Sequence, residues 1–227
     1  MAEKVKKYVP EYRGQLRDHC IEIPRCITQA SGIRIFGRRI KSLVFTTDIA
    51  IIRNINADAV IAVYPFTPQP AITHAILTGA DMPVFSGVGG GITSGARVVS
   101  LAMDAEALGA TGVVVNAPTS NDSIRRLKEV IDIPVVVTVA RMDTDIAARL
   151  EAGADILNVS SAQNTPELVA RIRRDFPKVP IIATGGPTEE SIRQTIAAGA
   201  NAITYTPLTC AELFKELMIR YRGENKL

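Results

Sequence analysis

The sequence predicts a (β/α)8 barrel, or TIM barrel, with an N-terminal helix and hairpin extension. Eight runs rich in Val, Ile and Ala are apolar throughout, which is typical of parallel strands buried on both faces. A helical pattern follows each run, and strict alternation of eight such pairs suits a closed barrel of this length. A doubly wound open sheet is the alternative. It is disfavoured because its glycine fingerprint is missing from the first turn.

The first 40 residues stand outside this repeat. Residues 16–30 have a helical pattern that Pro24 interrupts, and "IRIFGRRIKS" predicts a short hairpin that turns at Gly37. We expect this segment to cap the N-terminal mouth of the barrel or to form an oligomer contact. The predicted organisation is an extension over residues 1–40 and a barrel over 41–227, within one domain overall.

The eight strands are expected in order at 42–47, 59–64, 83–87, 112–116, 134–139, 155–160, 180–184 and 201–206. Proline opens the third, fifth and seventh of them, where its missing N–H is tolerated. Gly109, Gly153 and Gly199 stand where helices are expected to end, a position that favours the left-handed conformation of glycine. A βαβα pair therefore recurs four times, as in a barrel built from quarter-barrels.

Composition narrows the function. The formal net charge of +3 is dispersed, so no nucleic-acid partner is expected. No apolar run reaches the roughly 18 residues of a membrane span, and the N-terminus lacks the apolar core of a signal peptide. Three cysteines without a CxxC spacing indicate reduced thiols in a cytoplasmic protein. Two histidines and no metal motif lead us to expect no metal site.

In this fold the active site lies at the C-terminal ends of the strands. Asp48 follows the first strand, and we predict that it acts as acid or base, with Asn116 and Asn158 facing it from other strand ends. Neutral neighbours would raise the pKa of Asp48. The alternative is that Asp48 only caps the helix that starts near residue 49.

Two glycine-rich turns are candidate ligand sites. "TGGPTEES" puts Gly185 and Gly186 before a helix that begins near Thr188, where backbone N–H groups favour an anion. We expect a phosphate there, shared with the hydroxyls of Thr206 and Thr209; the alternative is a tight turn.

"FSGVGGGITSG" places Gly89 and Gly90 after the third strand, as a mobile lid or as a cradle for a ring or anion. A flexible loop is the alternative for this turn. Arg141 follows the fifth strand and suits a phosphate or carboxylate; a loop arginine facing solvent is its alternative.

These motifs carry a family resemblance. "VPIIATGGPTEESIRQTIAAGANAITYTP" resembles the last two units of phosphate-binding barrels: the ribulose-phosphate-binding group, the thiazole synthases and the barrels similar to inosine-monophosphate dehydrogenase. Over the full chain, "AVIAVYPFTPQP", "GVGGG" and "VVVNAPTSN" resemble an uncharacterised bacterial barrel family often labelled only "hydrolase". The strand-eight turn "TYTPLT" departs from the phosphate-binding group because it contains no glycine.

The expected function is an enzyme, a lyase, isomerase or hydrolase, acting on a small phosphorylated or carboxylated metabolite. An FMN-dependent oxidoreductase is one alternative, with FMN as its cofactor and the flavin phosphate at the Gly185–Gly186 turn. A non-catalytic ligand sensor is the other alternative, because the strand ends have few titratable groups. The expected partners are a small anionic ligand and further copies of the chain.

Overall fold

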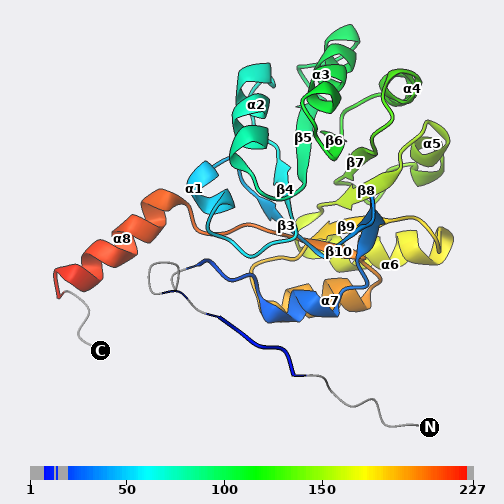
Figure 1. The fold of residues 1–227 in the computed structure, drawn as a ribbon. Helices are drawn as coiled ribbons and strands as arrows, with labels where there is room; N and C mark the ends of the chain where they lie inside the picture. Colours follow the sequence, from blue (N-terminus) through cyan, green and yellow to red (C-terminus); the bar gives the residue numbers. More distant parts are fainter. Residues whose placement is uncertain (1–7, 13, 15–19, 224–227) are drawn as a thin grey trace.

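The chain folds into a closed parallel barrel, which confirms the predicted fold class and excludes the open sheet. The computed structural model describes residues 8–12, 14 and 20–223. Eight strands close in the order β10-β3-β4-β5-β6-β7-β8-β9, each parallel to its neighbours (Figure 1). They are β3 (Ser42–Phe45), β4 (Ala59–Ala62), β5 (Val84–Gly89), β6 (Gly112–Val115), β7 (Val135–Val139), β8 (Ile156–Val159), β9 (Ile181–Thr184) and β10 (Ala202–Tyr205).

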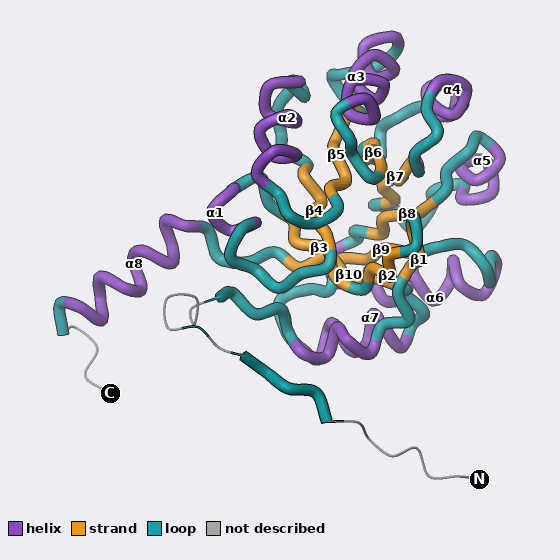
Figure 2. Tube along the Cα trace, viewed as in Figure 1, coloured by secondary structure: helices purple, strands orange, loops and turns teal. Residues whose placement is uncertain are grey.

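Helices follow the strands around the outside of the barrel, as the tube view shows (Figure 2). They are α1 (Ile49–Ile52), α2 (Pro70–Gly79), α3 (Ala96–Ala107), α4 (Asn121–Val130), α5 (Ile146–Glu151), α6 (Thr165–Asp175), α7 (Glu189–Ala197) and α8 (Cys210–Tyr221), with a 3-10 turn η3 (Ala162–Asn164) before α6. No helix in the described ranges is long and apolar enough to cross a membrane. Gly109, Gly153 and Gly199 follow helices with φ of 94°, 108° and 112°, as predicted.

The fourfold repeat is visible at the N-terminal ends of the strands. The carbonyl oxygens of Pro83, Pro134 and Pro180 accept hydrogen bonds of 2.8–3.0 Å from the strand that precedes each in the barrel. Side chains that start the second, sixth and eighth units cap the strand before them. Asp58 accepts from the Ser42 N–H at 3.0 Å, and Asp155 and Asn201 accept in the same way from the N–H groups of Val135 and Ile181. The prolines and polar residues that begin strands in the sequence thus form hydrogen bonds between neighbouring strands.

The predicted hairpin is present and closes the N-terminal end of the barrel. Strands β1 (Ile33–Ile35) and β2 (Arg38–Ile40) pair antiparallel. Ile33, Ile35 and Ile40 pack into the same buried cluster as the inward-facing strand residues Leu43, Ala59, Ile61, Phe85, Val114, Val136, Ile156, Ile182 and Ala202. The hairpin therefore completes the barrel core at the N-terminal ends of the strands.

Residues 20–30 occupy the outer sector between α7 and α1. Only a 3-10 turn, η2 (Arg25–Gln29), forms within the helical pattern expected over residues 16–30; residues 15–19 lie outside the described ranges. The backbone of Ile21 bonds to Asn54 and Asn56 beside α1, at 2.7 and 3.2 Å.

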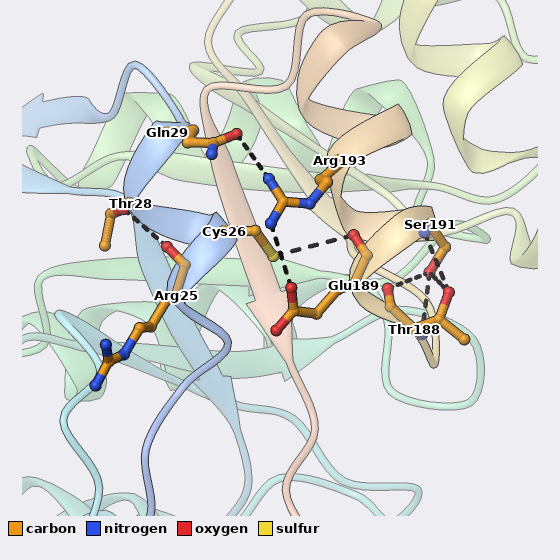
Figure 3. A network of polar contacts seen from close by, with 8 residues as sticks. All are labelled: Arg25, Cys26, Thr28, Gln29, Thr188, Glu189, Ser191 and Arg193. Atoms are coloured by element: carbon orange, nitrogen blue, oxygen red, sulfur yellow. Dashed lines mark hydrogen bonds and ion pairs between the residues drawn. The ribbon is translucent and has the colours of Figure 1, made fainter.

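On the other side of this sector, η2 meets α7. The Cys26 thiol points to the Glu189 carbonyl at 4.0 Å, and Arg193 donates to Gln29 at 3.4 Å (Figure 3). This segment covers the sector next to β10 and β3, and α8 extends away from the barrel with none of its residues buried (Figure 1).

Candidate functional site

Polar side chains line the inner wall of the C-terminal mouth over five consecutive strands. Side chains alternate between the two faces of a strand, so a residue two positions after an interior residue also faces inward. Val114, Val136, Ile156, Ile182 and Ala202 belong to the interior cluster. Two positions after them stand the residues that we call the polar arc: Asn116, Thr138, Asn158, Thr184 and Thr204.

Two oxygens of the polar arc are buried without a hydrogen-bond partner among the described residues: Asn158 Oδ1 and Thr204 Oγ1. Thr204 is 7% exposed. Asn158 donates from Nδ2 to Thr138 Oγ1 at 3.3 Å, which fixes its amide plane and leaves Oδ1 free. A buried polar group without a partner costs about 1–3 kcal/mol, so each such group needs an explanation.

The remaining three strands complete the wall with apolar or bare positions. The same two-residue step from Leu43, Ile61 and Phe85 leads to Phe45, Val63 and Gly87, which we call the apolar arc. Phe45 is 39% exposed although it is on the inward face, because this end of the barrel is open. The mouth is therefore divided into a polar side on β6–β10 and an apolar side on β3–β5.

A cavity of about 330 Å³ lies over the apolar arc, between the loops that follow β4 and β5. Its lining includes Val63, Tyr64, Pro65, Phe66, Thr67, Pro68, Gly87, Gly89, Gly90, Ile92, Thr93 and Asn116. Asn116 belongs both to this lining and to the polar arc. The cavity thus opens directly beside the polar side of the mouth.

Hydrogen bonds hold the two loops of this cavity. The Tyr64 hydroxyl accepts from the Gln69 N–H at 2.9 Å, and Thr93 Oγ1 bonds to Thr67 Oγ1 at 3.3 Å across the loops. Gly90 has a φ of 107°, and a Cβ there would lie 2.5 Å from Thr119 Oγ1 and 2.8 Å from the Asn116 backbone. Only glycine fits this close approach, which sets the position of Asn116 against the loop.

Asp48 is the N-cap of α1. Its carboxylate accepts from the N–H groups of Ala50 at 2.8 Å and Ile51 at 3.4 Å. A hydrogen bond with the Cys210 thiol, together with these N–H groups, lowers the pKa of Asp48, and the same contact raises the pKa of Cys210. The sequence predicted a raised pKa for Asp48, and this prediction is wrong, because hydrogen-bond donors rather than an apolar pocket surround the carboxylate.

The Gly185–Gly186 turn has packing reasons for its glycines. A Cβ on Gly185 would lie 2.7 Å from Ile192 and 2.8 Å from Ile203, and Gly186 has a φ of 78°. Thr188 caps α7 by accepting from the Ser191 N–H at 3.1 Å. The first turn of α7 carries Glu189 and Glu190, whose charges oppose a phosphate at this helix N-terminus.

The other two members of the predicted phosphate site lie after β10. Thr206 is exposed, and Thr209 caps α8 in a box with Glu212, which accepts from the Thr209 hydroxyl at 2.8 Å. The phosphate position stays a prediction, and the same acidic turn disfavours the flavin phosphate.

A second hollow, of about 540 Å³, lies between the loops after β6 and β7. Arg141 lies here but is exposed and pairs with Asp143, with bonds of 2.8 and 2.6 Å. Arg149 donates to the carbonyls of Ala117 and Thr119 and to Asn121, so it fastens the β6–α4 loop; burial lowers its pKa. Sequence reasoning missed this arginine because its partners are backbone carbonyls far along the chain.

The structure brings together some predicted site residues and separates others. Asn116 and Asn158 share the polar arc, and Gly89 and Gly90 meet Asn116 in the cavity. The other predicted residues have different contacts: Asp48 caps α1, Arg141 pairs with Asp143, and the Gly185–Gly186 turn packs against Ile192 and Ile203. Sequence reasoning also missed the cavity, although the "YPFTPQP" segment directly after a strand was a usable signal.

Comparisons with known proteins support the fold. No protein-family model and no curated protein matches the sequence. Among solved structures, a protein assigned as a phosphonomutase from Burkholderia cenocepacia J2315 aligns with a TM-score of 0.64 at 15% identity, over 85% of this chain and 95% of that one. Phosphonopyruvate hydrolase in complex with oxalate and Mg++ has a TM-score of 0.60 at 15% identity, over 82% and 83% of the two chains.

Another solved structure is that of 2,3-dimethylmalate lyase, a member of the PEP mutase/isocitrate lyase superfamily. It aligns with a TM-score of 0.61 at 13% identity, over 88% of this chain and 84% of that one. Within the described ranges, no three His, Cys, Asp or Glu side chains gather in one place. Identities this low show the fold alone: the chain is a TIM barrel, and the resemblance to phosphate-binding barrels holds only at the level of that fold.

Proposed function

We propose that the chain is an enzyme, a lyase, isomerase or hydrolase, that binds a small carboxylated or phosphorylated metabolite at the polar arc. The observation that carries this proposal is the pair of buried, unpartnered oxygens, Asn158 Oδ1 and Thr204 Oγ1, at the open end of the barrel. Such groups are retained when a ligand or ordered water completes their hydrogen bonds. The names of the structural neighbours, phosphonopyruvate hydrolase and dimethylmalate lyase, support the substrate class.

The polar arc can bind and orient such a ligand. Threonine hydroxyls and the amide of Asn116 supply donors to carboxylate or phosphate oxygens, while Asn158 Oδ1 accepts from a ligand hydroxyl. No side chain in the arc is negatively charged, so no carboxylate there repels an anion. Asp48 has a lowered pKa and a capping role, and we do not assign it the proton transfer.

A ligand sensor is the second candidate, and one observation favours it. All five side chains of the polar arc are neutral and none titrates near neutral pH, so the arc by itself supplies no general acid or base. A sensor binds the anion without converting it. Incubation of the protein with a bound compound, followed by mass and NMR analysis of that compound, separates the two: a changed mass or a changed spectrum supports the enzyme, and an unchanged mass with an unchanged spectrum supports the sensor.

Ligand-dependent stabilisation tests the proposed site. We expect oxalate or phosphonopyruvate to raise the melting temperature of the wild type. We expect Thr204→Val to raise the melting temperature of the free protein, because it removes an unpartnered buried hydroxyl, and to abolish most of the ligand shift. The control is Thr195→Val, which removes a buried hydroxyl that is bonded at 2.8 Å within α7. A ligand shift that is equal in both variants would contradict a site at the polar arc.

We also propose that the protein is a homo-oligomer of the cytoplasm. The three cysteines of the sequence have no CxxC spacing, which suits reduced thiols in a reducing compartment. Helix α8 leaves Phe214, Leu217, Met218 and Tyr221 exposed at the spacing of one helix face. A second copy of the chain would cover this face.

A further inference from the structure

We infer that the metabolite carries an apolar substituent, which the cavity over the apolar arc receives. This inference rests on the proposed function, since it extends the ligand from the polar arc across the mouth. Asn116 lines both regions, so one small molecule can place its anionic head against the polar arc and its substituent in the cavity. A volume of about 330 Å³ is within the range of small-molecule sites.

Apolar side chains make up part of the cavity wall, and backbone and polar side chains make up the rest. Val63, Pro65, Phe66 and Ile92 contribute apolar side chains, and the glycines at 87, 89 and 90 contribute bare backbone. Phe66 is 73% exposed and Ile92 is 99% exposed, so both stand at the rim with apolar surface in water. An apolar group in the cavity would remove part of this surface from water, which favours binding.

The polar side chains of the lining other than Asn116 already have hydrogen-bond partners. The Tyr64 hydroxyl accepts from the Gln69 N–H, and the Thr93 and Thr67 hydroxyls lie 3.3 Å apart. They therefore have fewer hydrogen bonds to offer a ligand, and Asn116 is left as the polar contact at the boundary with the arc. A hydroxylated or charged substituent would lose its water without full compensation, so the cavity selects an alkyl or aryl group.

A series of 2-oxo acids with one head group tests this inference: pyruvate, 2-oxopentanoate, 4-methyl-2-oxopentanoate and phenylpyruvate. We expect the dissociation constant, measured by calorimetry, to fall by about fourfold for each methylene that is buried. Equal affinity for pyruvate and phenylpyruvate would overturn the inference.

Two variants locate the effect. Val63→Thr places a hydroxyl in the wall at nearly equal volume, and Phe66→Ala removes an exposed ring that the fold does not need. Each is expected to weaken phenylpyruvate binding at least fivefold and to leave the dissociation constant of pyruvate within about twofold. The control is Phe36→Ala, because Phe36 is similarly exposed, at 69%, but lies in the hairpin turn at the opposite end of the barrel. A loss that is as large in the control would contradict the assignment.

Benzyl alcohol distinguishes failure of this inference from failure of the proposed function, because it has no anionic head. If no 2-oxo acid binds, the anion site at the polar arc is wrong. Amide shifts at Val63, Tyr64, Phe66, Thr67 and residues 89–93 on adding benzyl alcohol, lost in Val63→Thr, would still support an apolar cavity. Absence of those shifts together with a flat 2-oxo acid series would overturn the cavity as a ligand site.

Discussion

At the scale of single residues, neighbouring glycines of one loop have different roles. Gly90 approaches Thr119 Oγ1 and Asn116 so closely that a Cβ would lie 2.5–2.8 Å from them. Gly91 also has a positive φ, of 78°, but a Cβ there would meet nothing within 4 Å. The first glycine is required by contact and by conformation, and the second by conformation alone.

This difference predicts unequal costs for the same substitution. Gly91→Ala should lower the free energy of unfolding by about 1 kcal/mol, because only backbone strain is added. Gly90→Ala should lower it by at least about 2 kcal/mol more and displace Asn116, which weakens ligand binding. Urea unfolding of both variants measures the costs. Similar values for the two would show that the loop moves freely away from Asn116.

Asp48 gives a second prediction at this scale. Asp48→Ala should lower the free energy of unfolding by about 1 kcal/mol, whereas Asp48→Asn should keep it within a few tenths at neutral pH, because asparagine caps about as well. The pKa of Asp48 is lowered in the folded state, so its charge stabilises the fold above the unfolded pKa of about 3.9 and this contribution is lost as the pH falls through the folded pKa. Below about pH 4 the wild type should therefore lose stability faster than Asp48→Asn, in acid titrations followed by circular dichroism. Parallel titration curves would contradict this.

At the scale of elements, the structure shows why strands could be predicted better than side-chain roles. The eight apolar runs of the sequence are the eight barrel strands, because burial on both faces leaves an unbroken apolar pattern. Asn116 and Asn158 could be named because they lie at the C-terminal ends of strands. The use of Thr188 and Thr209 as helix caps could not be separated from ligand binding, since a cap and an anion site need the same donors and hydroxyls.

Helix α8 carries a prediction about assembly. Leu217 is 42% exposed in the middle of its apolar face, so the wild type should associate in light-scattering measurements. Leu217→Lys should shift the protein towards monomers, because a charge would be buried in the contact. Glu216→Lys introduces the same side chain one position away, on another face of the helix, and should leave association unchanged. A wild type that is monomeric at high concentration would exclude this contact.

At the scale of the whole molecule, the hairpin and the barrel share one core. Ile40 is 2% exposed and packs with the barrel interior, so Ile40→Ala should lower the free energy of unfolding by about 2–5 kcal/mol. Because the chain has no tryptophan, tyrosine fluorescence and circular dichroism follow unfolding. We expect a single shifted transition in both signals, with Ile92→Ala, at a 99% exposed position, nearly unchanged. An early separate transition would instead make residues 1–40 an independent unit.

The path of the N-terminal segment could not be predicted from the sequence. Pro24 and the short helical pattern suggested a cap on the barrel mouth or an oligomer contact. The position of this segment between α7 and α1 depends on hydrogen bonds to Asn54, Asn56 and Glu189, which are far along the chain. Helix α8 does not pack in that sector, and none of its residues is buried. The local sequence pattern determines the βα repeat, whereas tertiary contacts determine which segment covers the barrel between α7 and α1.

The unpartnered oxygens of the polar arc also imply a trade-off between stability and activity. Apolar isosteres such as valine at Thr204 would relieve an internal cost, so laboratory evolution for heat resistance alone should collect them at the barrel mouth. Evolution with a required ligand should preserve the hydroxyl. Because Ala202 and Thr204 are only two residues apart on one strand, about 6.6 Å, the change from structural core to adaptable surface is abrupt, and the mouth can be redesigned without repacking the barrel.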